Sequence, residues 1–220
     1  QGNASTGLGV DRDHRDLTIY DVLSGDMTLD DATIETAIPG LNLVPSTVDL
    51  VGAEIELVDA PRRSMRLADA FDVARSTGCL SRYDYVIIDC PPSLNLLTLN
   101  SLVAAGSILV PLQCEFFALE GLSLLLQTVR RIKVNFNPDL EIFGVVLTMF
   151  DKRNNLSRQV AADVRGVLGD KVFETVIPRN VRLSEAPSHG KPALIYDFKC
   201  SGSQAYMRLA KEIIRRENPR

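Results

Sequence analysis

The stretch "YDYVIIDCPPSLNLLTLN" at positions 83–100 decides the fold. Its continuous apolar centre, 86–88, predicts a strand that is buried on both faces. Asp89 ends this strand, and Pro91 and Pro92 then fix φ and remove two N–H donors, so the chain leaves the sheet on a stiff path. An apolar strand ending in Asp is the Walker B arrangement, in which the acid orients Mg²⁺ against nucleotide phosphates. On that feature alone, an Asp that caps the following helix is the commoner interpretation.

Around this stretch, apolar runs alternate with amphipathic segments. Such alternation predicts parallel strands joined by right-handed crossovers, which is an α/β fold with helices on both faces of a mostly parallel sheet. Ligands of such sheets bind beyond the carboxyl ends of the strands. Further strands are predicted at 107–112, 142–148 and 172–177, with a weaker one at 41–44, and helices at 17–25, 120–136, 156–169 and 203–217.

Two of these helical segments have an apolar stripe that we expect to face the protein core. In 156–169 the stripe is Val160, Val164, Val167 and Leu168, and in 203–217 it is Tyr206, Leu209, Ala210, Ile213 and Ile214.

Charge and composition restrict the function classes. The net charge of −4 is unevenly divided: 7 Lys+Arg against 16 Asp+Glu give −9 for residues 1–110, and the remaining 17 against 12 give +5 for 111–220. Such asymmetry is compatible with one surface that meets an anion. No apolar run reaches the length of a membrane span. Four cysteines without a CxxC pair give no metal pattern, and buried thiols in a reducing cytosol are the favoured interpretation.

The opening "QGNASTGLGV" at 1–10 has the glycine spacing of a phosphate-binding P-loop, G-x-x-x-x-G-K-[ST]. Gly2 and Gly7 match, but Leu8 and Gly9 stand where the motif needs Lys and then Ser or Thr. The stretch therefore lacks the cation for the β/γ-phosphates and the hydroxyl for Mg²⁺.

Five stretches of the chain are distinctive: "QGNASTGLG", "YDYVIIDCPPSLNLLTLN", "VPLQCEFFALEGLSLL", "GVVLTMFDKRNNLSRQV" and "VIPRNVRLSEAPSHGKP". Together they resemble the ParA (Soj-type) chromosome- and plasmid-partition ATPases, of the deviant Walker A group that includes MinD. The resemblance covers nearly all 220 residues. It implies a three-layer, P-loop NTPase-like fold, ATP and Mg²⁺ as cofactors, and an ATP-dependent homodimer in the cytoplasm, associated with the nucleoid. It also implies non-specific DNA binding, no membrane partner, and ATP hydrolysis stimulated by a ParB-like centromere-binding protein.

By this resemblance "QGN" at 1–3 belongs to switch I, and the true P-loop belongs upstream of it. Residues 1–220 are thus expected to form a single ParA-like ATPase domain that lacks the first strand, the P-loop and the first helix. We expect such a chain alone neither to bind ATP tightly nor to hydrolyse it.

The resemblance also implies residue roles. Asp89 is the Walker B acid, acting on Mg²⁺ through water. For the nucleotide site, Gln1, Gly2 and Asn3 match switch I, Pro91, Pro92 and Ser93 match switch II, and Thr148, Met149, Pro178 and Asn180 match the adenine side. For DNA, Arg153 and Arg182 match basic positions of the dimer surface, and Lys152, Arg179 and Lys191 extend them.

Three alternatives stay open. A MinD-like membrane ATPase would need exposed large apolar residues beside lysines on a C-terminal helix. A non-enzymatic module would keep DNA or partner contacts without nucleotide. A nitrogenase-type iron protein would need cluster-bridging cysteines, which Cys90 within "DCPPS" does not match.

Overall fold

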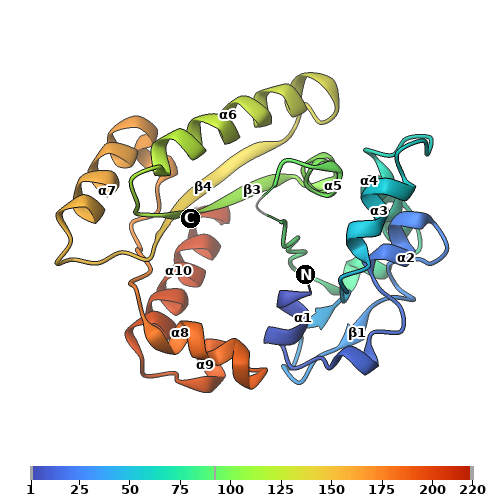
Figure 1. Ribbon diagram of the computed structural model, residues 1–220, viewed down its shortest axis with the longest axis horizontal. Helices are drawn as coiled ribbons and strands as arrows, with labels where there is room; N and C mark the ends of the chain where they lie inside the picture. The colour runs from blue at the N-terminus through green and yellow to red at the C-terminus, as the bar shows by residue number, and fades with distance from the viewer. Residues whose placement is uncertain (1, 92, 219–220) are drawn as a thin grey trace. The chain divides into compact units, whose positions relative to one another are not determined.

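The computed structural model describes residues 2–91 and 93–218, and in it the chain divides into two compact units (Figure 1). Unit 1 comprises the residues up to Ala105 together with Asn135–Pro138. Unit 2 comprises Gly106–Val134 together with the residues from Asp139 onwards.

Unit 2 is built on two parallel strands, β3 (Ser107–Gln113) and β4 (Glu141–Thr148). The segment 172–178 runs beside β4 in the same direction, through single bridges from Val145 to Val172 and from Phe150 to Pro178. The runs predicted at 107–112 and 142–148 are thus confirmed as parallel strands. The run predicted at 172–177 pairs at its ends but is interrupted between them.

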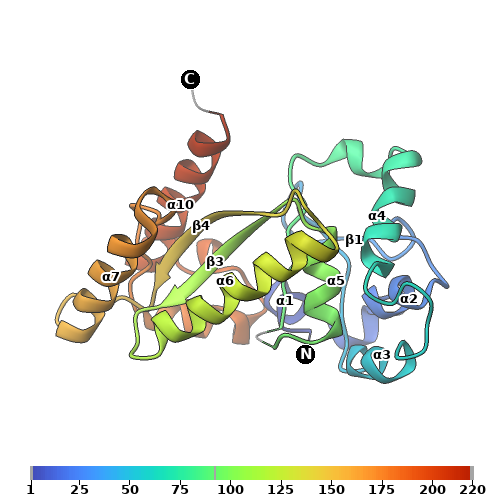
Figure 2. The same ribbon diagram turned by 90° about the horizontal axis from the view of Figure 1, so that it is seen from above.

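Helices cover both faces of this sheet, as Figures 1 and 2 show, with α6 on one side and α10 on the other. Side chains alternate along β4, so Val145 and Leu147 pack with α6 and α7, whereas Val146 packs with α10. The predicted α/β layering with helices on both faces is confirmed. The helices of unit 2 are α6 (Ala118–Asn135), α7 (Asn155–Leu168), α8 (Val181–Glu185), α9 (Ala193–Tyr196) and α10 (Ser201–Glu217), with 3-10 turns at Gly169–Lys171 and Ala186–His189.

Unit 1 is mostly helical, and its core lies between α2, α3, α4 and α5. Within it, α2 begins at a capping box formed by Thr18 and Asp21 and ends at Gly25, whose φ of 95° suits a glycine C-cap. Its elements are α1 (Asn3–Gly7), α2 (Ile19–Ser24), α3 (Leu50–Glu56), α4 (Arg66–Ser76), α5 (Leu96–Ala104), 3-10 turns at Arg12–His14 and Cys79–Arg82, and the antiparallel pair β1 (Ile34–Glu35) and β2 (Asn42–Leu43).

The strand predicted at 83–90 is absent from the described structure, and that prediction is wrong. The segment has neither helical nor strand hydrogen bonding, Ile87 is 89% exposed, and Ile88 alone of the apolar run packs on the unit 1 core. A strand needs a neighbour to accept and donate its backbone hydrogen bonds, and no described segment pairs with this one.

The predicted stripes of the two helices are only partly correct. In α10 the residues Tyr206, Ala210 and Ile214 are exposed, because the buried face is turned towards Ala205, Leu209 and Glu212. In α7, Val167 is exposed while Val160 and Val164 are buried. The expectation of buried thiols holds for Cys114 only, since Cys90 is exposed and Cys79 and Cys200 are partly so.

Candidate functional site

A cleft of about 600 Å³ lies in unit 2 where β4 and the segment beside it end. The loop after β4 contributes Phe150–Arg153, the neighbouring segment contributes Pro178–Val181, and α10 contributes Ser201 and Arg208. Parallel strands that end at one edge of a sheet bring their following loops together, which is why two loops distant in sequence share this cleft.

Five residues predicted from the sequence meet in this cleft. Lys152, Arg153 and Arg179 were predicted for DNA, and Pro178 and Asn180 for nucleotide. The structure therefore brings together residues that the resemblance assigned to two different ligands.

The cleft is strongly cationic. Lys152, Arg153, Arg179 and Arg208 line it, against the single carboxylate of Asp151. The backbone N–H of Arg153 donates to Asp151 at 2.9 Å, and this hydrogen bond holds the pKa of Asp151 below its usual value, so the carboxylate stays charged. Four cations against one anion favour the binding of a polyanion such as a phosphate chain.

Asn180 has two structural contacts that fix the cleft wall. Its side-chain oxygen accepts from the N–H of Arg182 at 2.9 Å and caps α8, and its amide donates to Ser201 at 2.9 Å. The first contact orients the start of α8, and the second joins that start to α10.

Four other predicted residues of unit 2 do not line the cleft: Thr148, Met149, Arg182 and Lys191. The carbonyl of Thr148 accepts from the N–H of Cys114 at 3.1 Å, and Met149 follows in the left-handed region with a φ of 52°. Such a conformation is uncommon for methionine and is often found where the surrounding structure enforces a functional geometry. Lys191 is exposed on the surface.

Arg182 lies between two carboxylates. Its guanidinium contacts Glu185 at 2.9 Å and Asp197 at 3.5 Å. The hydrogen bond that Arg182 donates to Glu185 and the negative charge of that carboxylate raise the pKa of Arg182. The two carboxylates offset the positive charge that Arg182 would present to a phosphate.

In unit 1, Asp89 is exposed but follows no strand in the described structure, so its Walker B role stays a prediction. The chain beyond it is tied to α5 by Thr98, whose hydroxyl lies within hydrogen-bond distance of the carbonyl oxygens of Pro91 and Ser93. Asn95 caps α5 by accepting from the N–H of Thr98 at 3.2 Å. Pro92 lies outside the described residues, and so does Gln1.

Gly2 is buried at the start of α1, with a φ of 65°. A Cβ at this position would meet the carbonyl oxygen of Ser46 at 2.4 Å and the Arg15 guanidinium at 2.7 Å, so only glycine fits. Arg15 is itself buried and donates to Ser46, Thr6 and Val10. Asn3 is exposed. The described structure thus gives Gly2 a packing role, and the catalytic role expected for Gly2 from the resemblance stays a prediction.

Sequence reasoning missed Arg15, Thr98 and Arg208. Arg208 follows Ser201 by seven residues, two helical turns, so the helical period places both on one face of α10. That period was the only available signal. For Arg15 and Thr98 no pattern in the sequence marks them.

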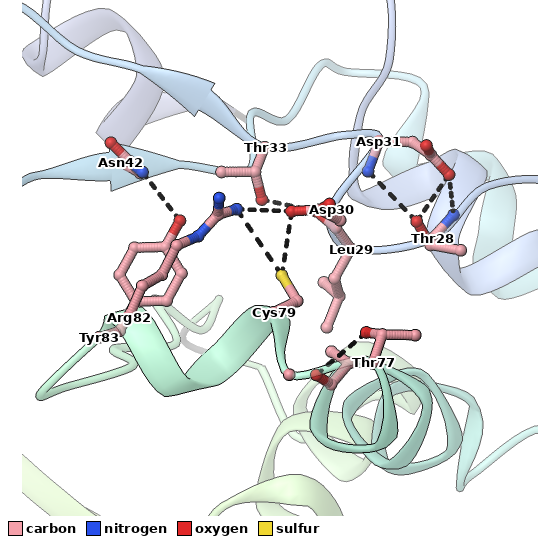
Figure 3. Close-up of polar contacts among 12 residues, drawn as sticks. Thr28, Leu29, Asp30, Asp31, Thr33, Asn42, Thr77, Cys79, Arg82 and Tyr83 are labelled. Carbon is pink, nitrogen blue, oxygen red and sulfur yellow. Dashed lines mark hydrogen bonds and ion pairs between the residues drawn. The ribbon is translucent and has the colours of Figure 1, made fainter.

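A cluster around Cys79 is structural rather than chemical (Figure 3). The thiol donates to Asp30 at 3.1 Å, and Arg82 contacts the same carboxylate at 2.5 Å. Burial, the hydrogen bond with Asp30 and the charge of that carboxylate raise the pKa of Cys79, so the thiol stays protonated. Beside it, Asn42 donates to the Tyr83 hydroxyl at 2.8 Å. The contacts of Asp30 join the 28–33 loop to the turn at 79–83, and the contact of Asn42 joins β2 to the same turn.

The described part of the chain contains neither a cluster of metal-binding side chains nor a membrane-spanning helix. No group of three or more His, Cys, Asp or Glu side chains is placed to hold a metal ion. A lone exposed Asp89 is compatible with a metal held mainly by nucleotide phosphates and water, the arrangement that Mg²⁺ prefers. Among the helices of residues 2–91 and 93–218, none is long and apolar enough to cross a bilayer.

Comparison with known proteins agrees with this architecture. The profile of a family described as an AAA domain matches residues 1–142. The chromosome partitioning protein ParA of Caulobacter vibrioides (strain NA1000 / CB15N) is 59% identical over 220 residues, which are 100% of this chain and 81% of that protein. The sporulation initiation inhibitor protein Soj of Bacillus subtilis (strain 168) is 50% identical over 213 residues, 97% of this chain and 82% of that protein.

Among solved structures, a cobyrinic acid a,c-diamide synthase from Mycobacterium smegmatis, with a bound ATP analogue and magnesium, superposes with a TM-score of 0.83. It is 35% identical, and the match covers 100% of this chain and 80% of that one. The fold is therefore P-loop NTPase-like α/β. The chain belongs to the ParA/Soj family of chromosome-partitioning ATPases.

Proposed function

We propose that a protein containing these 220 residues together with a P-loop hydrolyses ATP with Mg²⁺ to control a homodimer that binds DNA without sequence preference at the nucleoid. A ParB-like centromere-binding protein stimulates this hydrolysis. The observation that carries the proposal is the cationic cleft of unit 2, where residues matched to the nucleotide and residues matched to DNA lie together.

In this proposal each part of the chain has a distinct task. Pro178 and Asn180 contact the adenine side of the nucleotide, with Thr148 and Met149 nearby. Asp89 orients Mg²⁺ through water, and Gln1, Gly2, Asn3 and the loop of Pro91, Pro92 and Ser93 lie near the γ-phosphate. Bound Mg²⁺ would supply neutralisation of the phosphate charge that develops during phosphoryl transfer.

The DNA contacts are to phosphates. Arg153 is 92% exposed, and although its Nε lies 3.4 Å from a carboxylate oxygen of Asp151, its terminal guanidinium nitrogens are accessible to a backbone phosphate. Arg182, Lys152, Arg179 and Lys191 add to this surface. Lysine and arginine contacts to phosphate fix position but read no sequence, so the binding is weak, salt-sensitive and non-specific.

We further propose that the 220-residue chain alone does not hydrolyse ATP. No G-x-x-x-x-G-K-[ST] motif occurs in it, so the lysine that cradles the β/γ-phosphates is not supplied by these residues. Isothermal titration with ATP and Mg²⁺, together with a phosphate-release assay, tests this directly. Submicromolar binding or measurable turnover by these 220 residues would contradict it.

DNA binding is tested by fluorescence anisotropy with a duplex of arbitrary sequence over a range of salt concentrations. A plot of log K against log salt concentration has a negative slope. Arg153→Ala and Arg182→Ala should each make that slope less negative by about 0.9, the contribution of one neutralised phosphate. Arg62→Ala is the matched control, because Arg62 is an exposed arginine of unit 1 paired with Asp69. Binding that is strong and insensitive to both test substitutions would reject the assigned surface.

A MinD-like membrane role keeps one specific observation in its favour. Tyr206 and Ile214 are exposed on α10, contrary to the predicted stripe. Co-sedimentation with anionic liposomes decides between the two roles: we expect the chain to stay in the supernatant, and sedimentation abolished by Ile214→Asp would favour the membrane role.

A further inference from the structure

The segment beside β4 contains two more residues than regular pairing allows. The N–H of Phe173 donates to the carbonyl of Val145 at 2.9 Å, and the N–H of Ile177 donates to that of Leu147 at 2.8 Å. The segment therefore advances four residues while β4 advances two. In regular parallel pairing both strands advance by two. The N–H of Thr175, which regular pairing would bond to the carbonyl of Leu147, is thereby left without an acceptor on β4. The N–H of the alternate residue Glu174 points away from β4 in either register.

Glu212 of α10 supplies the acceptors for both N–H groups. One carboxylate oxygen accepts from the N–H of Glu174 at 2.8 Å, and the other accepts from the N–H of Thr175 at 2.9 Å. Glu212 is only 5% exposed, which is rare for a glutamate unless its charge is compensated. A carboxylate that accepts two backbone hydrogen bonds makes charge-assisted bonds, which are stronger than those between neutral groups.

Arg216, one turn further along α10, compensates the buried charge. It donates to Glu212 at 2.9 Å and to the carbonyls of Asp170 and Val172 at 2.9 and 3.1 Å. Its guanidinium also lies 4.1 Å from the centroid of the Phe173 ring. Glu212 thus holds N–H groups of the extra residues, while Arg216 holds the carbonyls just before them.

The segment returns to regular pairing at the cleft. The carbonyl of Ile177 accepts from the N–H of Phe150 at 3.1 Å, and the N–H of Arg179 donates to the carbonyl of Phe150 at 3.1 Å. Next to these bonds, Asn180 donates to Ser201 at the start of α10. The helix therefore holds the segment at both ends, and the cleft residues 178–180 follow directly on the part that Glu212 fixes.

We propose that Glu212 is a positioning residue that sets the register of the 172–178 segment and so places Pro178, Arg179 and Asn180 in the cleft. The proposal rests on the proposed function only in taking this cleft as the ligand site. Glu212 does not line the cleft and acts through the backbone of Glu174 and Thr175.

The experiment compares amide hydrogen exchange in the wild-type chain, Glu212→Gln and Leu122→Ala. The glutamine keeps the shape of the side chain but has one acceptor oxygen, and its NH₂ group faces a backbone donor. Leu122 is buried on α6, on the opposite face of the sheet, so its loss lowers the stability of unit 2 without touching Glu212's partners.

In Glu212→Gln, we expect peptides from 172–180 to exchange about tenfold faster through local opening, while peptides from β3, α6 and α7 keep their wild-type rates. In Leu122→Ala the whole unit should respond together. As a second readout, the side-chain amide resonance of Asn180 should shift in Glu212→Gln and not in Leu122→Ala. Wild-type exchange at 172–180, or acceleration as uniform as that of Leu122→Ala, would overturn the proposal.

If Glu212→Gln does not fold, Arg216→Lys replaces it. Lysine keeps the charge beside Glu212 but cannot make the fork of bonds to two carbonyls, so the same local pattern is expected at smaller size. Neither readout uses nucleotide or DNA. A failure of the register role is therefore distinguishable from a failure of the proposed function, which the ATP and DNA titrations test separately.

Discussion

Gly144 of β4 is predicted to tolerate no side chain, although its backbone conformation is open to any residue. An added Cβ would lie 2.5 Å from Cε2 of Phe173 and 2.9 Å from the carbonyl oxygen of Lys171, both closer than the 3.0 Å below which real Cβ atoms essentially never approach another atom. Neither neighbour can yield easily. Phe173 is completely buried beneath Arg216, and the oxygen of Lys171 belongs to the backbone.

Two effects of Gly144→Ala oppose each other. Overpacking a buried site costs about 1–3 kcal/mol, whereas replacing glycine stabilises by about 0.4–1 kcal/mol through the unfolded chain. The clash should win, so we expect a net loss of roughly 1–2 kcal/mol in the free energy of unfolding. Urea denaturation followed by circular dichroism measures it.

Gly166→Ala provides the matched control for this change. Gly166 lies inside α7, and an added Cβ there meets nothing within 4 Å, so alanine should stabilise by up to about 1 kcal/mol through helix propensity. Combining Gly144→Ala with Phe173→Leu removes the ring contact but not the carbonyl contact. The double variant should therefore lose about 1 kcal/mol less than the sum of the two single losses. A Gly144→Ala chain within about 0.5 kcal/mol of wild type, or strict additivity, would refute the reasoning.

Three further predictions follow from buried or paired side chains. Asn100 is 1% exposed, accepts from the N–H of Leu67 and donates to the carbonyls of Arg63 and Leu96. Asn100→Ala should therefore lower the free energy of unfolding, measured with urea, by about 2–4 kcal/mol, and a decrease below about 1 kcal/mol would contradict these bonds. Burial raises the pKa of Glu212, but the N–H groups of Thr175 and Glu174 and the charge of Arg216 outweigh it and lower the pKa below 4.5. The ionised Glu212 carboxylate therefore contributes its full stabilisation above the unfolded-chain pKa of 4.5 and loses it as the pH falls through the lower pKa of the folded chain. Below pH 4.5 the temperature of unfolding should therefore depend less on pH in Glu212→Gln than in wild type. Asp197→Asn should tighten DNA binding by removing one of the two acidic partners of Arg182, although the 2.9 Å pair with Glu185 remains, and the gain should vanish in an Arg182→Ala background. A gain that persists there would indicate a general effect of charge.

The sequence predicted the elements of unit 2 well because their evidence is local. The apolar runs at 107–112 and 142–148 became β3 and β4, each with a boundary within one residue of the prediction. The same kind of run at 83–90 failed. An apolar run shows that a segment is suited to a buried strand, but it contains no information on whether a partner strand lies beside it, and pairing is a property of two segments.

The cleft was predicted in part, for a related reason. Lys152, Arg153, Pro178, Arg179 and Asn180 follow strand ends and lie within recognisable motifs, so both topology and resemblance place them together. Arg208 belongs to a helix whose inward face was assigned from the apolar residues alone. Arg208 itself is exposed and lines the cleft, and an apolar pattern contains no signal for an exposed arginine.

Glu212 shows why the apolar pattern misplaced α10. A glutamate between Lys211 and Ile213 is normally taken to face solvent, since burying a carboxylate without partners is costly. Here the cost is offset by Arg216, one turn further along the same helix, and by two backbone N–H groups of the irregular segment beside β4. The irregularity of one element and the buried charge of another explain each other. Neither is visible in its own stretch of sequence, so a helix-by-helix or strand-by-strand prediction would miss both.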